Sequence, residues 1–131
     1  MRKYLVGGNW KCNGNMAFAK SFPAEVLNNL KFNPSKVDVV VAPTALHIPT
    51  VQGVVGNNVQ VATQNLSLTG DGAYTGELST HMITDMGIKW TLTGHSERRT
   101  LFGESDADVA KKTKIALDAG MGVLACIGEL K

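Results

Sequence analysis

The stretch "TLTGHSERRTLFGE" (residues 91–104) sets polar side chains directly against the end of an apolar segment. The β-branched part stops at Gly94, and the five residues from His95 to Arg99 are all polar or charged. Such an ending is typical of a buried strand in a parallel sheet, because parallel strands bring the residues that follow them to one common edge. Polar groups at that edge can act on a single ligand.

Outward from this stretch, apolar runs alternate with helical patterns. Strands are predicted over residues 3–10, 37–43, 59–65, 89–95 and 121–128. Helical segments are predicted between them, over residues 16–32, 45–55, 78–87, 96–102 and 105–120. This alternation with short connections predicts βα units on a parallel sheet, either doubly wound or closed into a (β/α) barrel. No linker, sequence repeat or low-complexity tract interrupts it, so we expect one domain over residues 1–131.

Residues at the helix ends support these boundaries. Ser79 and Ser105 are predicted N-caps, and acidic residues follow Ser105 at the positive end of its helix. In the segment 16–32, Pro23 predicts a kink or a restart, with Ser21 as a candidate N-cap.

Composition excludes several functional classes. The net charge is +2, and the basic residues are scattered apart from short pairs such as Lys111–Lys112, which does not fit a nucleic-acid footprint. No apolar stretch approaches the roughly 20 residues that span a bilayer, and no signal peptide opens the sequence. Cys12 and Cys126 lie far apart, which favours two reduced thiols in a cytoplasmic protein.

The residues just after the five strands carry the chemistry. They include one cation, two carboxylates, an imidazole and several amides: Asn9, Trp10, Lys11, Pro43, Thr44, Gln64, Asn65, His95, Ser96, Glu97, Gly128 and Glu129. No Cys/His cluster has metal-ligand spacing and no phosphate loop motif occurs, so we expect no metal and no cofactor. The set suits an acid/base or polarising site for a small anionic substrate.

Five segments resemble the triosephosphate isomerase family. They are "GGNWKCNG" (7–14), "VVVAPTALHI" (39–48), "VATQNLSLTGDGAYTGELS" (61–79), "TGHSERRTLFGESD" (93–106) and "GMGVLACIGE" (120–129), in the family's order and spacing. The resemblance implies a (β/α)8 barrel, here its N-terminal part with about four βα units and a fifth strand. It also implies interconversion of dihydroxyacetone phosphate and glyceraldehyde 3-phosphate through an enediolate.

Family members have about 250 residues. The segments that carry the family's general-base glutamate, its lid and its phosphate loops are missing from these 131 residues. We therefore expect an N-terminal fragment that is inactive alone and needs a complementary C-terminal half or a covering chain. The alternatives are an inactive half-barrel that serves as a structural or assembly module, and a phosphosugar-binding relic.

The resemblance also implies roles for individual residues. His95 acts as a neutral hydrogen-bond donor to the enediolate, a tuning already known for this family. Lys11 contacts the substrate, Asn9 helps to position the oxyanion side, and Glu97 is either catalytic or supporting. Thr75, in the loop 65–79, approaches the active site of the second subunit of a homodimer.

Further expectations concern packing and association. Asn9, Lys11 and His95 are expected to converge on one pocket, and the edge strands "YLVGG" and "GVLAC" are expected to promote association. His47 and His81 are interpreted as surface or interface residues, and Cys126 as buried packing. Thr93 stands where the family more often has an aliphatic residue, so its hydroxyl is expected to affect packing only.

Overall fold

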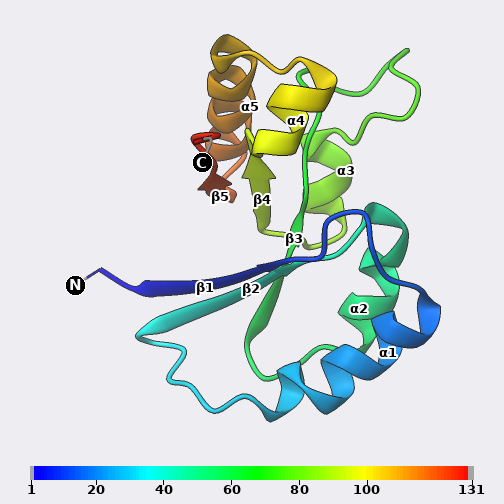
Figure 1. Ribbon diagram of the computed structural model, residues 1–131, viewed down its shortest axis with the longest axis vertical. Helices are drawn as coiled ribbons and strands as arrows, with labels where there is room; N and C mark the ends of the chain where they lie inside the picture. Colours follow the sequence, from blue (N-terminus) through cyan, green and yellow to red (C-terminus); the bar gives the residue numbers. More distant parts are fainter. Residues whose placement is uncertain (1, 130–131) are drawn as a thin grey trace. The chain divides into compact units, whose positions relative to one another are not determined.

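The run Val37–Ala42 (β2) is apolar on both faces and is the middle one of three parallel strands in the first part of the chain. It pairs with Tyr4–Asn9 (β1) on one side and with Val59–Thr63 (β3) on the other. The computed structural model, which describes residues 2–129, divides into two compact units, and these three strands belong to the first, Met1–Gln64 (Figure 1). The last four residues of β2 are buried and supply much of the core of this unit.

Helices connect these strands, as the alternating pattern predicts. Met16–Glu25 (α1) and the 3₁₀ turn Leu27–Asn29 (η1) link β1 to β2. The 3₁₀ turn Ala45–His47 (η2) and Ile48–Val54 (α2) link β2 to β3. The two α-helices contact each other, and α2 also contacts β3 (Figure 1).

The start of α1 differs from the sequence prediction. Asn15 caps the helix, because its side chain accepts a 2.8 Å hydrogen bond from the N–H of Phe18, and Ser21 lies inside the helix. Pro23 is buried on the same face as Ala19, one turn earlier. The helix continues for two residues past Pro23 and then tightens into η1, so the predicted interruption falls at its end.

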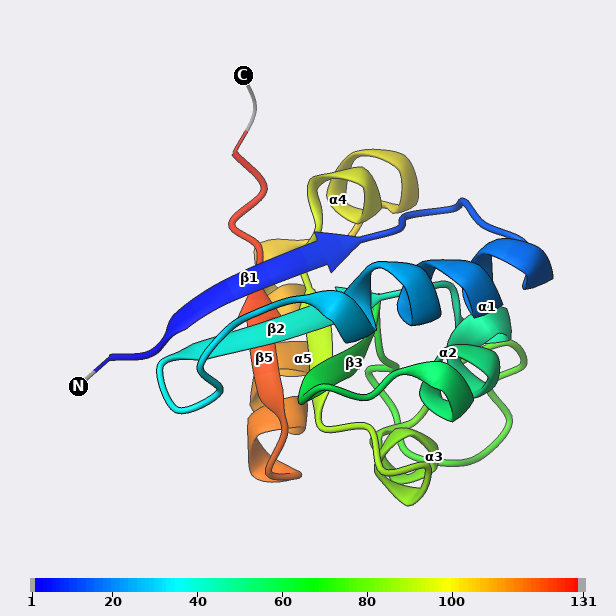
Figure 2. The ribbon, with the colours of Figure 1, turned by 90° about the horizontal axis from the view of Figure 1, so that it is seen from below.

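The strand β1 lies at one edge of this sheet and is its most exposed part. Tyr4 is 77% exposed and Val6 58%. The helix α1 lies near the other end of the strand (Figure 2). There Trp10 packs edge-on against Phe18, with ring centroids 4.7 Å apart. An apolar hollow of about 410 Å³ remains between this helix and the strands β1 and β2.

The second unit, Asn65–Lys131, is built on two parallel strands. Trp90–Thr93 (β4) pairs with Gly122–Ala125 (β5), and the helix Asp106–Asp118 (α5) packs on both strands. Thr80–Asp85 (α3) and Ser96–Phe102 (α4) complete the unit, and both predicted serine caps are confirmed. At Ser105 the cap is a capping box, in which its hydroxyl oxygen accepts from the Asp108 N–H and the Asp108 carboxylate accepts from the Ser105 N–H.

Within residues 2–129, no helix is long and apolar enough to cross a membrane.

Candidate active site

The first strand ends in a sharp turn at Lys11. The N–H of Trp10 still donates to the carbonyl of Ala42, at 3.0 Å, and so extends the pairing of β1 with β2 by one residue. Lys11 then adopts a left-handed backbone conformation with φ = 56°. This conformation costs a residue other than glycine about 1–2 kcal/mol, so contacts around the turn must offset that cost.

Two side chains hold the backbone of Lys11. The Asn9 Oδ1 accepts a 2.8 Å hydrogen bond from the Lys11 N–H, and the Gln64 Nε2 donates a 2.8 Å bond to the Lys11 carbonyl. Each such bond contributes about 1 kcal/mol net, so the two together match the cost of the left-handed turn. Gln64 also donates to the Ala42 carbonyl at 3.0 Å, and this use of both amide hydrogens fixes the orientation of its side chain.

The fourth strand ends in a second left-handed turn, at Gly94. Its φ is +69°, and a Cβ at this position would lie 2.6 Å from Val109 Cγ1 and 2.7 Å from the Cys126 carbonyl oxygen. Only glycine fits here. His95 follows and begins α4 as its N-cap.

The His95 ring is oriented by the helix that it begins. Its Nδ1 accepts a 3.2 Å hydrogen bond from the Glu97 N–H. A nitrogen that accepts carries no proton, so we assign the proton of a neutral ring to Nε2. The Glu97 carboxylate lies 3.5 Å from the same Nδ1, which is longer than an ordinary hydrogen bond. The ring can therefore present an N–H donor to an acceptor oxygen.

Arg99 fixes the ends of β4 and β5. Its Nε donates to the Gly94 carbonyl at 2.7 Å, and its Nη2 donates to the Cys126 carbonyl at 3.2 Å. The third contact is an ion pair of 2.5 Å between Nη1 and the Asp106 carboxylate. The Arg99 side chain therefore connects the ends of β4 and β5 to the start of α5. One of these contacts is to Gly94, the residue before His95.

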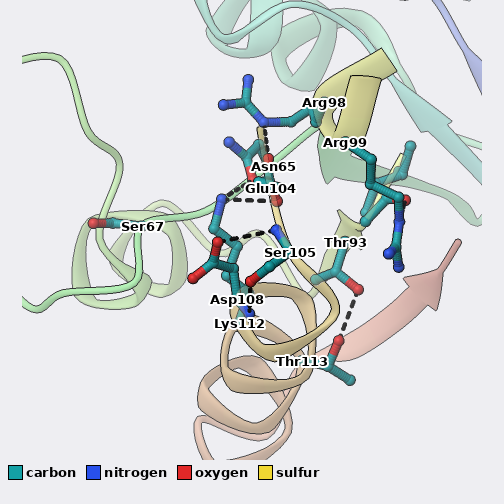
Figure 3. A network of polar contacts seen from close by, with 12 residues as sticks. Asn65, Ser67, Thr93, Arg98, Arg99, Glu104, Ser105, Asp108, Lys112 and Thr113 are labelled. Carbon is teal, nitrogen blue, oxygen red and sulfur yellow. Dashed lines mark hydrogen bonds and ion pairs between the residues drawn. The ribbon is translucent and has the colours of Figure 1, made fainter. Parts of the chain in front are cut away.

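Arg98 points into a separate buried network, drawn in Figure 3. The Glu104 side chain, 8% exposed, pairs with Arg98 Nε through one oxygen. Its other oxygen lies 3.2 Å from Lys112 Nζ, without the alignment of a hydrogen bond. Lys112 is equally buried and donates to Asn65 Oδ1 at 2.9 Å. These contacts join α4, α5 and the first residue of the loop 65–79.

The Thr93 hydroxyl has a partner inside the second unit. Thr93 is buried, and its Oγ1 lies 2.8 Å from the Thr113 Oγ1 on α5 (Figure 3). The departure from the more usual aliphatic residue therefore leaves no unsatisfied hydroxyl.

The loop 65–79 is closed by its own contacts. The Ser67 N–H donates to the Leu78 carbonyl at 2.8 Å, and the Asp71 carboxylate accepts from the Ser79 hydroxyl and pairs with His81 Nδ1. The hydrogen bond from Ser79, and after it the contact with His81, hold the pKa of the Asp71 carboxyl below its usual range. Thr75, near the middle of this loop, is exposed.

Other residues singled out from the sequence take lesser places. His81 is exposed, and His47 is half-buried with its Nδ1 2.9 Å from the Thr44 hydroxyl. Cys126 is partly buried, and this burial raises the pKa of its thiol. Residues 2–129 hold no group of three or more His, Cys, Asp or Glu side chains that could bind a metal ion.

The proposed site residues thus follow strands in both units. Asn9 and Lys11 follow β1 in the first unit, and His95 and Glu97 begin α4 in the second. Sequence reasoning found these residues but missed the supporting roles of Gln64, Arg99 and the Glu104 network.

Comparison with known proteins identifies the family. The family model described as "Triosephosphate isomerase" matches residues 4–131. The chain belongs to the triosephosphate isomerase family. The resemblance drawn from the five segments is confirmed, and with it the fold class, the N-terminal part of a (β/α)8 barrel rather than a doubly wound sheet.

Individual triosephosphate isomerases match along almost the whole chain. The protein from Coprinopsis cinerea is 48% identical over 98% of this chain, and that from Neurospora crassa 47% over 99%. The chloroplastic enzyme of Fragaria ananassa is 44% identical over 97%. The chain covers 51%, 52% and 40% of these relatives, respectively, so it spans about half of their length.

Proposed function

We propose that this chain provides the N-terminal half of a triosephosphate isomerase active site, acting on dihydroxyacetone phosphate and glyceraldehyde 3-phosphate. The observation that carries the proposal is the His95 ring, whose Nδ1 accepts the Glu97 N–H. An isomerase of this kind removes a proton next to a carbonyl and must stabilise the negative charge that develops on the carbonyl oxygen. A neutral imidazole with its proton on Nε2 can donate to that oxygen.

Asn9 and Lys11 take complementary roles in this proposal. The Asn9 oxygen is engaged by the Lys11 N–H, so its NH₂ group is the end that we assign to the oxyanion side of the substrate. The Lys11 ammonium supplies positive charge for an anionic substrate, and it sits on an exposed turn where a ligand can reach it. Glu97 acts as a supporting residue, because its backbone N–H orients His95.

We propose that the remaining chemistry is supplied from outside these 131 residues. The family's general base and phosphate loops do not occur among the 131 residues, so we propose that the chain alone has no isomerase activity. General-base catalysis contributes roughly 10²- to 10⁴-fold, and the phosphate contacts supply further binding energy for the reaction. We propose a complementary C-terminal half as the partner, a homodimer of the completed barrel with Thr75 at its interface, and a cytoplasmic location.

The alternative of an inactive assembly module depends on the exposed edge of β1. Tyr4, Leu5 and Val6 are all exposed there, and an open apolar edge is a template for pairing with another chain. An inactive assembly module would use this edge and would leave His95 without a function.

A complementation assay tests the proposal and separates the two candidates. The purified 131-residue chain is assayed alone and with the C-terminal half of the Coprinopsis cinerea relative, for conversion of glyceraldehyde 3-phosphate. We expect no activity alone and measurable activity in the mixture. His95→Ala should lower the activity of the mixture by about 10²- to 10³-fold, the usual effect of removing one oxyanion donor.

The control variant is His81→Ala, which removes an exposed histidine in the same unit. It should leave the activity unchanged. Turnover by the chain alone, abolished by His95→Ala, would contradict the proposed need for a second chain. A mixture that is active regardless of His95 would contradict the proposed site.

A further inference from the structure

The side chain of Gln64 makes contacts that none of the assigned roles explains. We propose that Gln64 is a positioning residue for Lys11: its amide holds the left-handed turn that directs the lysine ammonium to the substrate. The inference rests on the proposed function, since Lys11 is assigned there to substrate contact. In this proposal Gln64 acts only through Lys11 and does not contact the substrate.

The contacts of Gln64 link the ends of three strands. Gln64 comes directly after β3, and its NH₂ group donates to the carbonyl of Ala42 at the end of β2. The same NH₂ group donates to the carbonyl of Lys11, two residues after β1. One planar amide therefore relates the turn that carries Lys11 to the two neighbouring strands of the sheet.

The turn depends on being held from both sides. The Lys11 N–H is held by Asn9, which lies on the same strand and moves with it. The Lys11 carbonyl is held by Gln64, 53 residues away in the chain. Lysine disfavours a positive φ, so release of the carbonyl allows the peptide to rotate towards the ordinary region. Such a rotation changes the direction of the Cα–Cβ bond and therefore the position of the ammonium group.

The size of the effect follows from the sensitivity of catalysis to position. A displacement of about 1 Å of a catalytic group costs on the order of 10²-fold in rate. Because Lys11 would be displaced and not removed, a change at Gln64 should cost less than removal of the ammonium. We expect a loss of about 10- to 100-fold.

Gln64→Glu is the sharpest variant. It keeps the length and shape of the side chain but replaces the two N–H donors with a carboxylate that faces two carbonyl oxygens. Gln60→Glu is the matched control, because Gln60 lies on the same strand, is also half-buried, and is in register with Val40 rather than with the end of β2. Both variants are assayed with the complementary C-terminal half described above.

A double-mutant cycle distinguishes positioning from a general structural role. In the mixture, we expect Gln64→Glu to lower kcat/KM by about 10- to 100-fold and Gln60→Glu to change it less than about twofold. In the Lys11→Ala background, Gln64→Glu should cause no further loss, because it acts through a side chain that is no longer present. An equal loss in both backgrounds would show a structural role only and would overturn the inference.

Backbone amide exchange of Lys11, followed by NMR in the 131-residue chain, is a readout that does not need activity. The Lys11 amide should exchange faster in Gln64→Glu than in wild type, while the buried strand amides of β2 remain as protected as in Gln60→Glu. Unchanged exchange at Lys11 would overturn the inference even if the mixture proves inactive.

The outcomes separate this inference from the proposed function. If Lys11→Ala leaves the mixture fully active, Lys11 does not contact the substrate, and both the assignment of Lys11 and the inference about Gln64 fail. If Lys11→Ala lowers activity but Gln64→Glu does not, the inference alone fails.

Discussion

Two turns in this chain each follow a parallel strand and each present one proposed catalytic side chain, but they are held by opposite means. The turn at Lys11 is exposed, strained, and held by the neutral amides of Asn9 and Gln64. In the turn at Gly94–His95, Gly94 is buried, and its carbonyl is held by the charged side chain of Arg99.

The two turns differ in how much the stability of the protein depends on the contacts that hold them. Around His95, the turn is followed by the helix α4, and α4 is joined to α5 by the buried contacts of Arg98, Glu104 and Lys112. At Lys11 the backbone is held in a conformation that costs free energy, and the residue is exposed. Changes near His95 should therefore destabilise the protein, and changes at Lys11 should alter function without destabilising it.

The largest expected effect is the loss of one partner of the buried pair. Lys112→Met leaves the Glu104 carboxylate buried beside Arg98 alone, and breaking a buried pair in this way costs about 3–5 kcal/mol. The free energy of unfolding is measured by urea denaturation at pH 7.

Lys114→Met is the control on the same helix. Its pair with Asp118 is exposed, so its loss should cost no more than about 0.5 kcal/mol. Equal costs for Lys112→Met and Lys114→Met would show that the buried Glu104–Lys112 pair does not stabilise the second unit. Replacing Glu104 and Lys112 together by Leu and Met should recover part of the loss, because the buried carboxylate is removed together with its lysine partner.

The next effect concerns the glycine that precedes His95. Gly94→Ala adds the strain of a positive φ, about 1 kcal/mol, to overpacking against Val109 and the Cys126 carbonyl, which typically costs 1–3 kcal/mol. The free energy of unfolding should therefore fall by about 2–4 kcal/mol. Gly103→Ala is matched in φ, at 68°, but has open space around its Cβ, so it should cost only about 1 kcal/mol. If Gly94→Ala and Gly103→Ala lower the free energy of unfolding equally, Val109 and the Cys126 carbonyl can move aside and the packing around Gly94 is loose.

Much of the framework that carries both turns follows from local sequence signals. The doubly apolar run at β2, the cap at Ser79 and the cap at Ser105 each depend on residues within one element, so the sequence predicts them. Pro23 suggests a kink or a restart with Ser21 as a cap, but Pro23 is buried with Ala19 inside α1, and the helix continues to Glu25.

The supporting contacts could not be predicted in the same way. Gln64 reaches Lys11 across 53 residues, and the contact exists only because the register of three strands aligns their ends. Lys112 is adjacent to Lys111 and looks like another solvated lysine, yet Lys112 is buried while Lys111 is exposed. Only the packing of α5 decides which of the two pairs with Glu104.

The smallest expected change in the free energy of unfolding is at Lys11. The sign of this change shows whether the left-handed turn costs stability. Lys11→Gly removes the cost of a left-handed backbone for a residue with a Cβ, so the free energy of unfolding should stay constant or rise by up to about 1 kcal/mol. Asn58→Gly is the control, because Asn58 also has a positive φ, of 61°, but asparagine tolerates that region better than lysine. Its effect should be smaller.

The same Lys11→Gly variant should behave differently in the complementation assay. It removes the ammonium while it retains the backbone turn, so activity with the C-terminal half should fall as far as it does in Lys11→Ala, even though the chain is no less stable. A wild-type lysine at a position where glycine is equally or more stable is explained by function and not by folding. If Lys11→Gly instead destabilises the chain by 1 kcal/mol or more, the lysine stem contributes packing at this turn, and the contrast between the Lys11 and His95 turns is smaller than their hydrogen bonds indicate.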